Sequence, residues 1–236
     1  MNTSFWENLK AKPELHNYIS PSIEIGYATF GPTVCLSGNL SASGKIVFID
    51  DISLVIHPRG QEMKYLFEWL TFRPHQFSGT GYTGADVIMA AKFMVTPAQP
   101  HVYNILFSDQ GCYFDLKQLF ADIKKYWEAG QGEKDGLTPE EKAAAFEHFK
   151  KSPLFKEYNR TIASLCYWHA GDYEMTMNIT TNKPKQNFIV HRIFTLPAAE
   201  EQLLRTNVEM IFADLCNLPD FDYYYATVPL RAAPDQ

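Results

Sequence analysis

A chain of 236 residues with 46% hydrophobic and 20% charged residues can build a substantial core, which excludes an intrinsically disordered protein. Its formal net charge is −6, and its basic residues never run to more than two in a row. Nucleic-acid binding needs a concentrated basic surface, so this balance argues against a nucleic-acid partner.

The sequence also argues against a membrane span. It has no run of about 18 apolar residues, the length that crosses a bilayer, and its first residues lack the apolar segment of a secretory signal. The cysteines form no CxxC pair, so they predict neither a zinc site nor a disulfide: they are Cys35, Cys112, Cys166 and Cys216. We therefore expect a cytoplasmic protein with reduced thiols.

The first part of the chain is predicted to consist mainly of strands. Residues 4–12 favour a short helix that ends near Pro13. Apolar residues then alternate with other residues over 23–27 and recur over 34–40, a pattern typical of β-strands.

Residues 45–72 predict a long antiparallel hairpin whose turn contains Pro58 and Gly60. Asp50-Asp51 interrupts its first strand, so we predict a β-bulge there; the alternative is a buried carboxylate with a perturbed pKa. Five apolar residues share one parity and are predicted to face the core: Ile46, Phe48, Ile52, Leu54 and Ile56.

Two more strands are predicted over 87–95 and 102–108, after which the spacing of apolar residues becomes helical. One apolar stripe predicts a first helix: Leu116, Leu119, Phe120, Ile123 and Trp127. Thr138 begins a capping box for a second helix, and Ser152-Pro153 begins a third.

The β pattern returns at Asp172, where apolar and polar residues alternate up to Thr180, and a second strand is predicted over 188–196. Pro197 then begins one further helix, and a tyrosine-rich strand over 221–230 closes the sequence. The inward side of that helix is predicted to carry Leu204, Val208, Ile211 and Leu215.

This order of elements predicts a mainly β (α+β) fold, an antiparallel β-sandwich interrupted by a helical insertion. The boundaries are 1–111 for the first β segment, 112–168 for the insertion and 169–236 for the second β segment, which completes the same sandwich. The alternative is two small β domains joined by the helices. The layout resembles immunoglobulin-like and arrestin-like sandwiches, a likeness of architecture that implies no function.

Two motif matches fail on their context. Residues 79–84 match GxGxxG, but no strand precedes them and prolines follow, so a dinucleotide site is not predicted. In residues 131–142, Gly136 occupies the sixth position, where an EF-hand loop has its glycine. Gln131 and Lys142, however, occupy the positions of the first and last acidic ligands of such a loop. We therefore expect no cofactor and no metal.

The polar cluster at 168–174 is the main candidate site. His169, Asp172 and Glu174 could form a metal site or an acid–base pair, although no nucleophile motif and no second histidine at metal spacing accompany them. Aromatic residues with a polar group are typical interface anchors, and the candidates for binding a ligand or partner are Trp168, His169, Tyr223, Tyr224 and Tyr225.

The sequence therefore favours a non-enzymatic binding module whose partner is a protein or a small molecule, with a homo-oligomer as a further possibility. The alternative is a hydrolase or metal-dependent enzyme that uses His169, Asp172 and Glu174.

Overall fold

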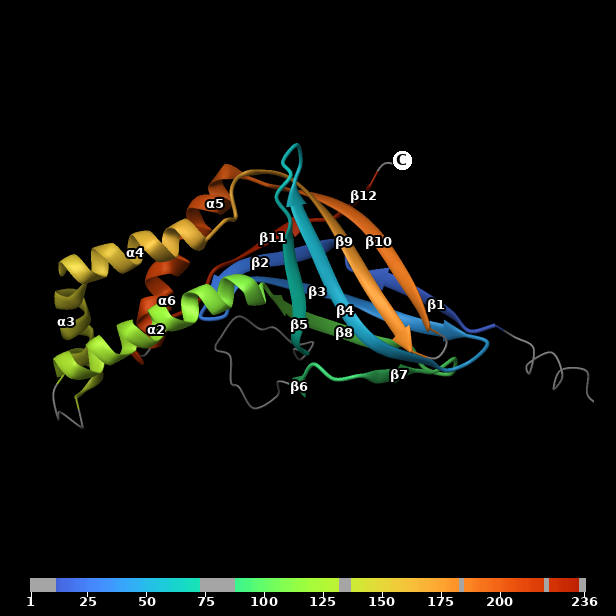
Figure 1. Cartoon of the computed structure of the whole chain (residues 1–236), viewed down its shortest axis with the longest axis horizontal. Helices are drawn as coiled ribbons and strands as arrows, with labels where there is room; N and C mark the ends of the chain where they lie inside the picture. Colours follow the sequence, from blue (N-terminus) through green and yellow to red (C-terminus); the bar gives the residue numbers. More distant parts are fainter. Residues whose placement is uncertain (1–11, 73–87, 132–136, 183–184, 219–220, 234–236) are drawn as a thin grey trace, which may run out of the picture.

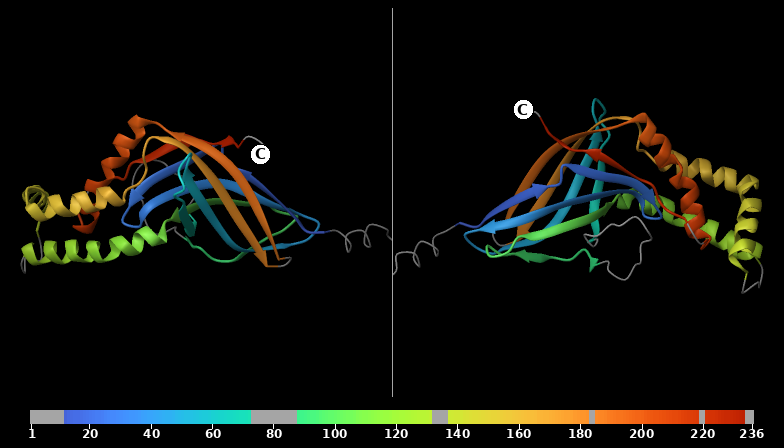
Figure 2. Two further views of the ribbon diagram at one scale, coloured as in Figure 1. Left: turned by 45° about the horizontal axis from the view of Figure 1, so that its top comes forward. Right: turned by 180° about the vertical axis from the view of Figure 1, so that it is seen from behind.

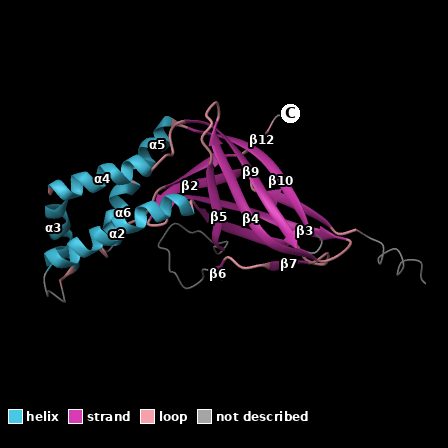
Figure 3. Cartoon of the chain, viewed as in Figure 1, coloured by secondary structure: helices cyan, strands magenta, loops and turns pink. Residues whose placement is uncertain are grey.

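The computed structural model describes residues 12–72, 88–131, 137–182, 185–218 and 221–233. Within them, twelve strands form one antiparallel sheet, with helices gathered at one of its ends (Figure 1 and Figure 3). The mainly β, antiparallel prediction is confirmed, and an immunoglobulin-like or arrestin-like sandwich is not. Residues 4–11 of the expected helix and the GxGxxG stretch lie outside the described residues.

The strands of the first half come from two continuous stretches of chain. They are β1 (Glu14–Ile19), β2 (Ser22–Ala28), β3 (Gly31–Ser43), β4 (Val47–Pro58), β5 (Tyr65–Phe72), β6 (Ile88–Met89), β7 (Phe93–Val95) and β8 (His101–Ser108). The strand expected over 87–95 is therefore two short pieces. The break has a physical reason, since β6 pairs with β5 whereas β7 pairs with β4.

The second half of the chain adds four strands to the same sheet: β9 (Gly171–Asn182), β10 (Lys185–Leu196), β11 (Tyr225–Pro229) and β12 (Arg231–Ala232). The order across the sheet is β11-β2-β3-β8-β5-β4-β9-β10-β12, with β1 beside β3. The alternation predicted from Asp172 is confirmed, because Tyr173, Met175, Met177 and Ile179 are all buried.

The C-terminal strand brings the two ends of this order together. β11 pairs with β2, and two residues after Pro229 the same chain, as β12, pairs with β10. The sheet is therefore nearly closed into a barrel (Figure 2). None of the helices in the described ranges combines the length and the apolarity that crossing a membrane requires.

The predicted bulge in β4 is confirmed, and it corrects part of the predicted core. The register against β9 shifts between Ile49 and Asp51, so the side of the strand that faces inward changes at this point. Ile52, Leu54 and Ile56 are buried as predicted. Before the bulge the buried residues are Val47 and Ile49, whereas Ile46 and Phe48 are 45% and 40% exposed.

The helical insertion between β8 and β9 contains α2 (Gln110–Gln131), α3 (Pro139–Lys150) and α4 (Pro153–Leu165). The predicted stripe on α2 is confirmed, with all its residues buried except the half-buried Leu119. The capping box is also confirmed: the Thr138 hydroxyl accepts from the Glu141 N–H, and the Glu141 carboxylate accepts from the Thr138 N–H.

The single helix expected after Pro197 is two helices, α5 (Ala198–Arg205) and α6 (Asn207–Leu215). Thr206 breaks it, because both its backbone N–H and its hydroxyl donate to the carbonyl oxygen of Leu203 (3.1 and 2.6 Å). Such a local side-chain bond competes with the regular helical pattern. Leu204, Val208 and Ile211 are nevertheless buried, as predicted.

Candidate functional site

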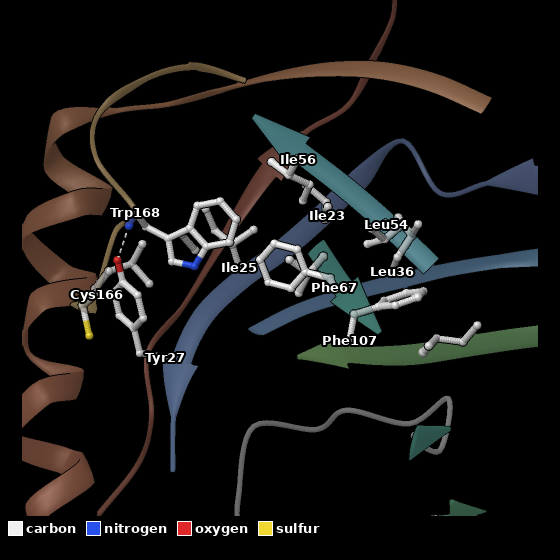
Figure 4. Packing of buried hydrophobic residues seen from close by; sticks show 14 of the residues in the cluster. Ile23, Ile25, Tyr27, Leu36, Leu54, Ile56, Phe67, Phe107, Cys166 and Trp168 are labelled. Atoms are coloured by element: carbon white, nitrogen blue, oxygen red, sulfur yellow. Dashed lines mark hydrogen bonds between the residues drawn. The ribbon is translucent and has the colours of Figure 1, made fainter. Parts of the chain in front are cut away.

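Trp168 lies in the core where the helical insertion returns to the sheet. It is 1% exposed and stacks on Phe67 with 5.7 Å between ring centroids. Its indole N–H donates to the carbonyl oxygen of Gly26 (3.1 Å), and its backbone N–H donates to the hydroxyl of Tyr27 (Figure 4). A ring held in this way offers no exposed surface to a partner.

His169 joins the start of β9 to α5. Its Nδ1 lies 3.2 Å from the carboxylate of Glu201, which also accepts from the Ala170 N–H (2.7 Å) and from Arg205 (2.6 Å). The Ala170 N–H first, then Arg205 and His169, lower the pKa of Glu201 to about 2. These contacts hold the loop before β9 against helix α5.

Asp172 and Glu174 have partners of their own. Asp172 accepts a hydrogen bond from the Thr195 hydroxyl (2.6 Å). Glu174 pairs with Arg59 (3.2 Å) and lies 3.4 Å from His57 Nε2. The structure thus gives each member of the predicted acidic and histidine cluster a different set of contacts. Among the residues it describes, no group of three or more His, Cys, Asp or Glu side chains is arranged to hold a metal ion.

The tyrosines before and within β11 anchor the C-terminal strand. The Tyr223 hydroxyl donates to Asp214 of α6 (2.7 Å), and the Tyr224 hydroxyl donates to Glu200 of α5. The ring of Tyr225 covers Gly26, where even a Cβ atom would meet it at 2.6 Å. All three rings are partly buried, so their contacts within the chain are established and their role toward a partner stays a prediction.

One cavity, of about 400 Å³, lies between the helical insertion and α6. Its lining is Leu137, Pro139, Lys142, Asp214, Asn217, Leu218 and Phe221. Asp214 already accepts hydrogen bonds from Thr29 and Tyr223. The carboxylate in the lining of this cavity is therefore already engaged by the chain itself.

A second cavity, of about 330 Å³, lies beside the bulge in β4, and we call it the Phe48–Met94 cavity. Phe48 and Met94 stand opposite each other in the pairing of β4 with β7, and they are 40% and 55% exposed. The charged residues of the wall, Asp50 and Lys92, form an ion pair. The complete lining is Phe48, Ile49, Asp50, Lys92, Phe93, Met94 and Asn182.

The bulge is what makes this cavity. It turns Phe48 outward and places Asp50 in the extra position of the strand, within reach of Lys92. The result is an apolar hollow with one charge pair in its wall, suited to hold an apolar group next to a polar one. In the sequence, the Asp50-Asp51 interruption is the signal for this site, whereas the outward position of Phe48 follows from the pairing of β4 with β9.

Comparisons of the chain with protein-family models, with curated proteins and with solved structures give no match.

Proposed function

We propose that this protein is a non-enzymatic binding module that recognises a protein partner through the Phe48–Met94 cavity. The observation that carries the proposal is an exposed aromatic ring and an exposed thioether, neighbours on adjacent strands, that both line a cavity of about 330 Å³. Isolated apolar residues are ordinary on a surface, whereas an apolar pair that lines a cavity is typical of a binding site.

The dimensions favour one anchoring side chain. About 330 Å³ is at the small end of ligand pockets, which span about 300–1,000 Å³. Interfaces commonly depend on one apolar or aromatic residue inserted into such a pocket. Met94 supports this use because a flexible, polarizable side chain adapts to different anchors.

The charge pair in the wall would orient the partner. The side chain of Asp50 is 31% exposed and that of Lys92 is 71% exposed, so both remain able to bind polar groups that flank an inserted side chain. The pair itself contributes little to folding, since exposed ion pairs are worth roughly 0–1 kcal/mol. We infer that it contributes to specificity instead.

The proposal can be tested by selecting binders from a library of random peptides. We expect the selected peptides to share an aromatic or aliphatic anchor, and their affinity to fall at least tenfold for Phe48→Ser and Met94→Ser. Leu66→Ser is the matched control, because Leu66 is an equally exposed apolar residue (53%) on β5. Binding that survives both cavity variants, or that is lost equally in the control, would contradict the proposal.

Other expectations from the sequence are not needed for this proposal. A cytoplasmic location, a homo-oligomer and an immunoglobulin-like or arrestin-like sandwich stay predictions. The enzyme alternative would require His169, Asp172 and Glu174 to act on one substrate, and their separate contacts lend it no support.

A further inference from the structure

The sheet is open along one line, between β1 and the first part of β10. Among the described strands, β1 pairs only with β3. β10 pairs with β9 along its whole length, but with β12 only at Arg192 and Ile193. Residues 185–191 and 194–196 of β10 therefore have one edge without a neighbouring strand in the described part of the chain, and 185–191 is the longer stretch.

Nearer the helices, the C-terminal strand closes the same gap in the sheet. Its first part, β11, pairs antiparallel with β2, and its last part, β12, pairs antiparallel with β10 (Figure 2). β1 continues beyond β2 along the same neighbour, β3. β1 and β10 both run antiparallel to the C-terminal strand, so another strand in its direction could pair with both of their edges.

The burial of inward-facing residues changes along β10. Near the helices, Phe194 and Leu196 are each 1% exposed. Phe188 and Val190 share their parity and pack against the core, yet both are only partly buried. A strand with apolar residues facing inward would complete the cover of these two side chains.

The margins of the opening are basic, although the whole chain carries a net charge of −6. Lys12 and Lys185 form no ion pair with any acidic side chain that the structure describes. Arg192 is not part of this margin: it is paired with the buried Met175 of β9, shares the inward parity of Phe188 and Val190, and donates to the backbone carbonyl of His191 (2.9 Å). The acidic residue on this margin is Glu14, which is close to His16.

We propose that this opening binds an acidic, extended segment of a partner protein, which adds to the sheet as a strand antiparallel to β10 and β1. The backbone of the segment would supply the missing hydrogen bonds, its inward side chains would be apolar, and its acidic side chains would meet the basic margin. Two copies of this chain are a poorer match, because joining two β10 edges would bring like charges together.

This surface does not depend on the Phe48–Met94 cavity. The probe is a fluorescent peptide of about eight residues, long enough to span β1, in which aspartate and valine alternate. We expect binding by fluorescence anisotropy that weakens in high salt, and at least tenfold weaker binding of a peptide with lysine in place of aspartate. Peptides N-methylated at alternate residues should also bind at least tenfold more weakly, since they lack half of the N–H donors.

Protein variants locate the site. Lys185→Glu and Lys12→Glu should each weaken binding of the aspartate peptide at least fivefold, whereas Lys156→Glu on α4 and Phe48→Ser should leave it unchanged. Amide hydrogen exchange should show that the peptide protects residues 14–19 and 187–191. Equal binding of the aspartate and lysine peptides, protection elsewhere, or equal loss in Lys156→Glu would overturn the proposal. So would self-association of Lys185→Glu without peptide binding by the original protein, since the basic margin would then serve only to prevent edge-to-edge pairing of two copies.

Discussion

Single polar side chains hold the helices against the sheet. Asn207, the first residue of α6, is fully buried and donates to the carbonyl oxygens of Tyr27 (3.1 Å) and Tyr224 (2.7 Å). Its own side-chain oxygen accepts from the Tyr224 N–H (2.7 Å). Since an unpaired buried polar group costs about 1–3 kcal/mol, this one amide fixes α6, the end of β2 and the approach to β11 relative to one another.

The carboxylate of Glu201 is the residue whose contribution should depend on pH. Its pKa is about 2 in the folded chain and 4.5 without these contacts, so it stabilises the fold above pH 4.5 and loses this effect as the pH falls toward 2. Glu201→Gln should lower the free energy of unfolding by about 1–2 kcal/mol at pH 7. This loss is smaller than the pKa shift alone would imply, because His169 and Arg205 are 63% and 55% exposed and solvent screens their interaction with Glu201.

Urea unfolding of the original protein and of Glu201→Gln at several pH values measures this difference. It should shrink steadily below pH 4.5. Glu68→Gln is the control, because Glu68 is exposed on β5 and has no ion pair with a described residue. If the difference in free energy of unfolding between the two proteins stays constant from pH 7 to pH 3, Glu201 acts by its shape and not by its charge.

Gly38 is required by the close approach of three strands. A Cβ atom at this position of β3 would collide with the carbonyl oxygen of Tyr18 on β1 and with the hydroxyl of Tyr103 on β8. One of these collisions is with backbone, so a side-chain rotation cannot relieve both. Gly38→Ala should therefore lower the free energy of unfolding by about 3 kcal/mol.

The matched control is Gly130→Ala in α2, where a Cβ atom would have nothing within 4 Å. Alanine should be neutral there or stabilise the helix by roughly 0.5 kcal/mol. Both variants can be compared by urea unfolding at a common m-value. If Gly38→Ala proves as stable as Gly130→Ala, β1 cannot lie as close to β3 as described.

At the scale of elements, the bulge in β4 decides which residues face the core. Val47 and Ile49 are buried before it, and Ile52, Leu54 and Ile56 after it. Removing one residue between Ile49 and Ile52 would place both groups on one face of a regular strand. Deleting Asp50 should therefore give a folded protein that has lost the charge pair of the Phe48–Met94 cavity, with a cost of about 2 kcal/mol.

Deleting Ser53 makes the contrasting variant. Ser53 lies in the regular part of β4, paired with Glu68 and Asn178, so its removal would turn one of the two buried groups outward. Far-UV circular dichroism and urea unfolding should show a native-like protein for the Asp50 deletion and an unfolded or aggregated one for the Ser53 deletion. A folded Ser53 deletion would mean that the pairing of β4 tolerates slippage.

Individual elements could be predicted from the sequence because their signals are local. The alternation after Asp172, the stripe on α2 and the capping box at Thr138 each depend on residues within a few positions of one another. The bulge was also visible, in Asp50-Asp51. The side that Phe48 faces could not be predicted. It depends on which of the two acidic residues takes the extra position of the bulge, and the pairing of β4 with β9 decides this.

At the scale of the whole molecule, the sequence could not predict how the sheet closes. Gly26 and Tyr225 are paired across the junction of β2 and β11, although 199 positions separate them. The candidate site was missed for a similar reason. His169 meets Glu201 because α5 follows β10, and Phe48 meets Met94 because β7 pairs with β4. No local pattern records these long-range partners.

The sheet and the helices should unfold as one unit. Their buried residues form one continuous cluster, in which Phe155 of the insertion packs on Phe212 of α6 with 4.3 Å between ring centroids. Two variants can test this, one retaining only Trp127 of α2 and the other only Trp168, each with its other tryptophans replaced by phenylalanine.

Within each variant, tryptophan fluorescence and far-UV circular dichroism should give the same urea midpoint, because a two-state transition is independent of the probe. The comparison is made inside one variant, so any loss of stability from the replacements affects both signals equally. If Trp127 reports unfolding at a lower urea concentration than circular dichroism does, the helices form a separate unit. The alternative of distinct domains joined by helices would then regain support.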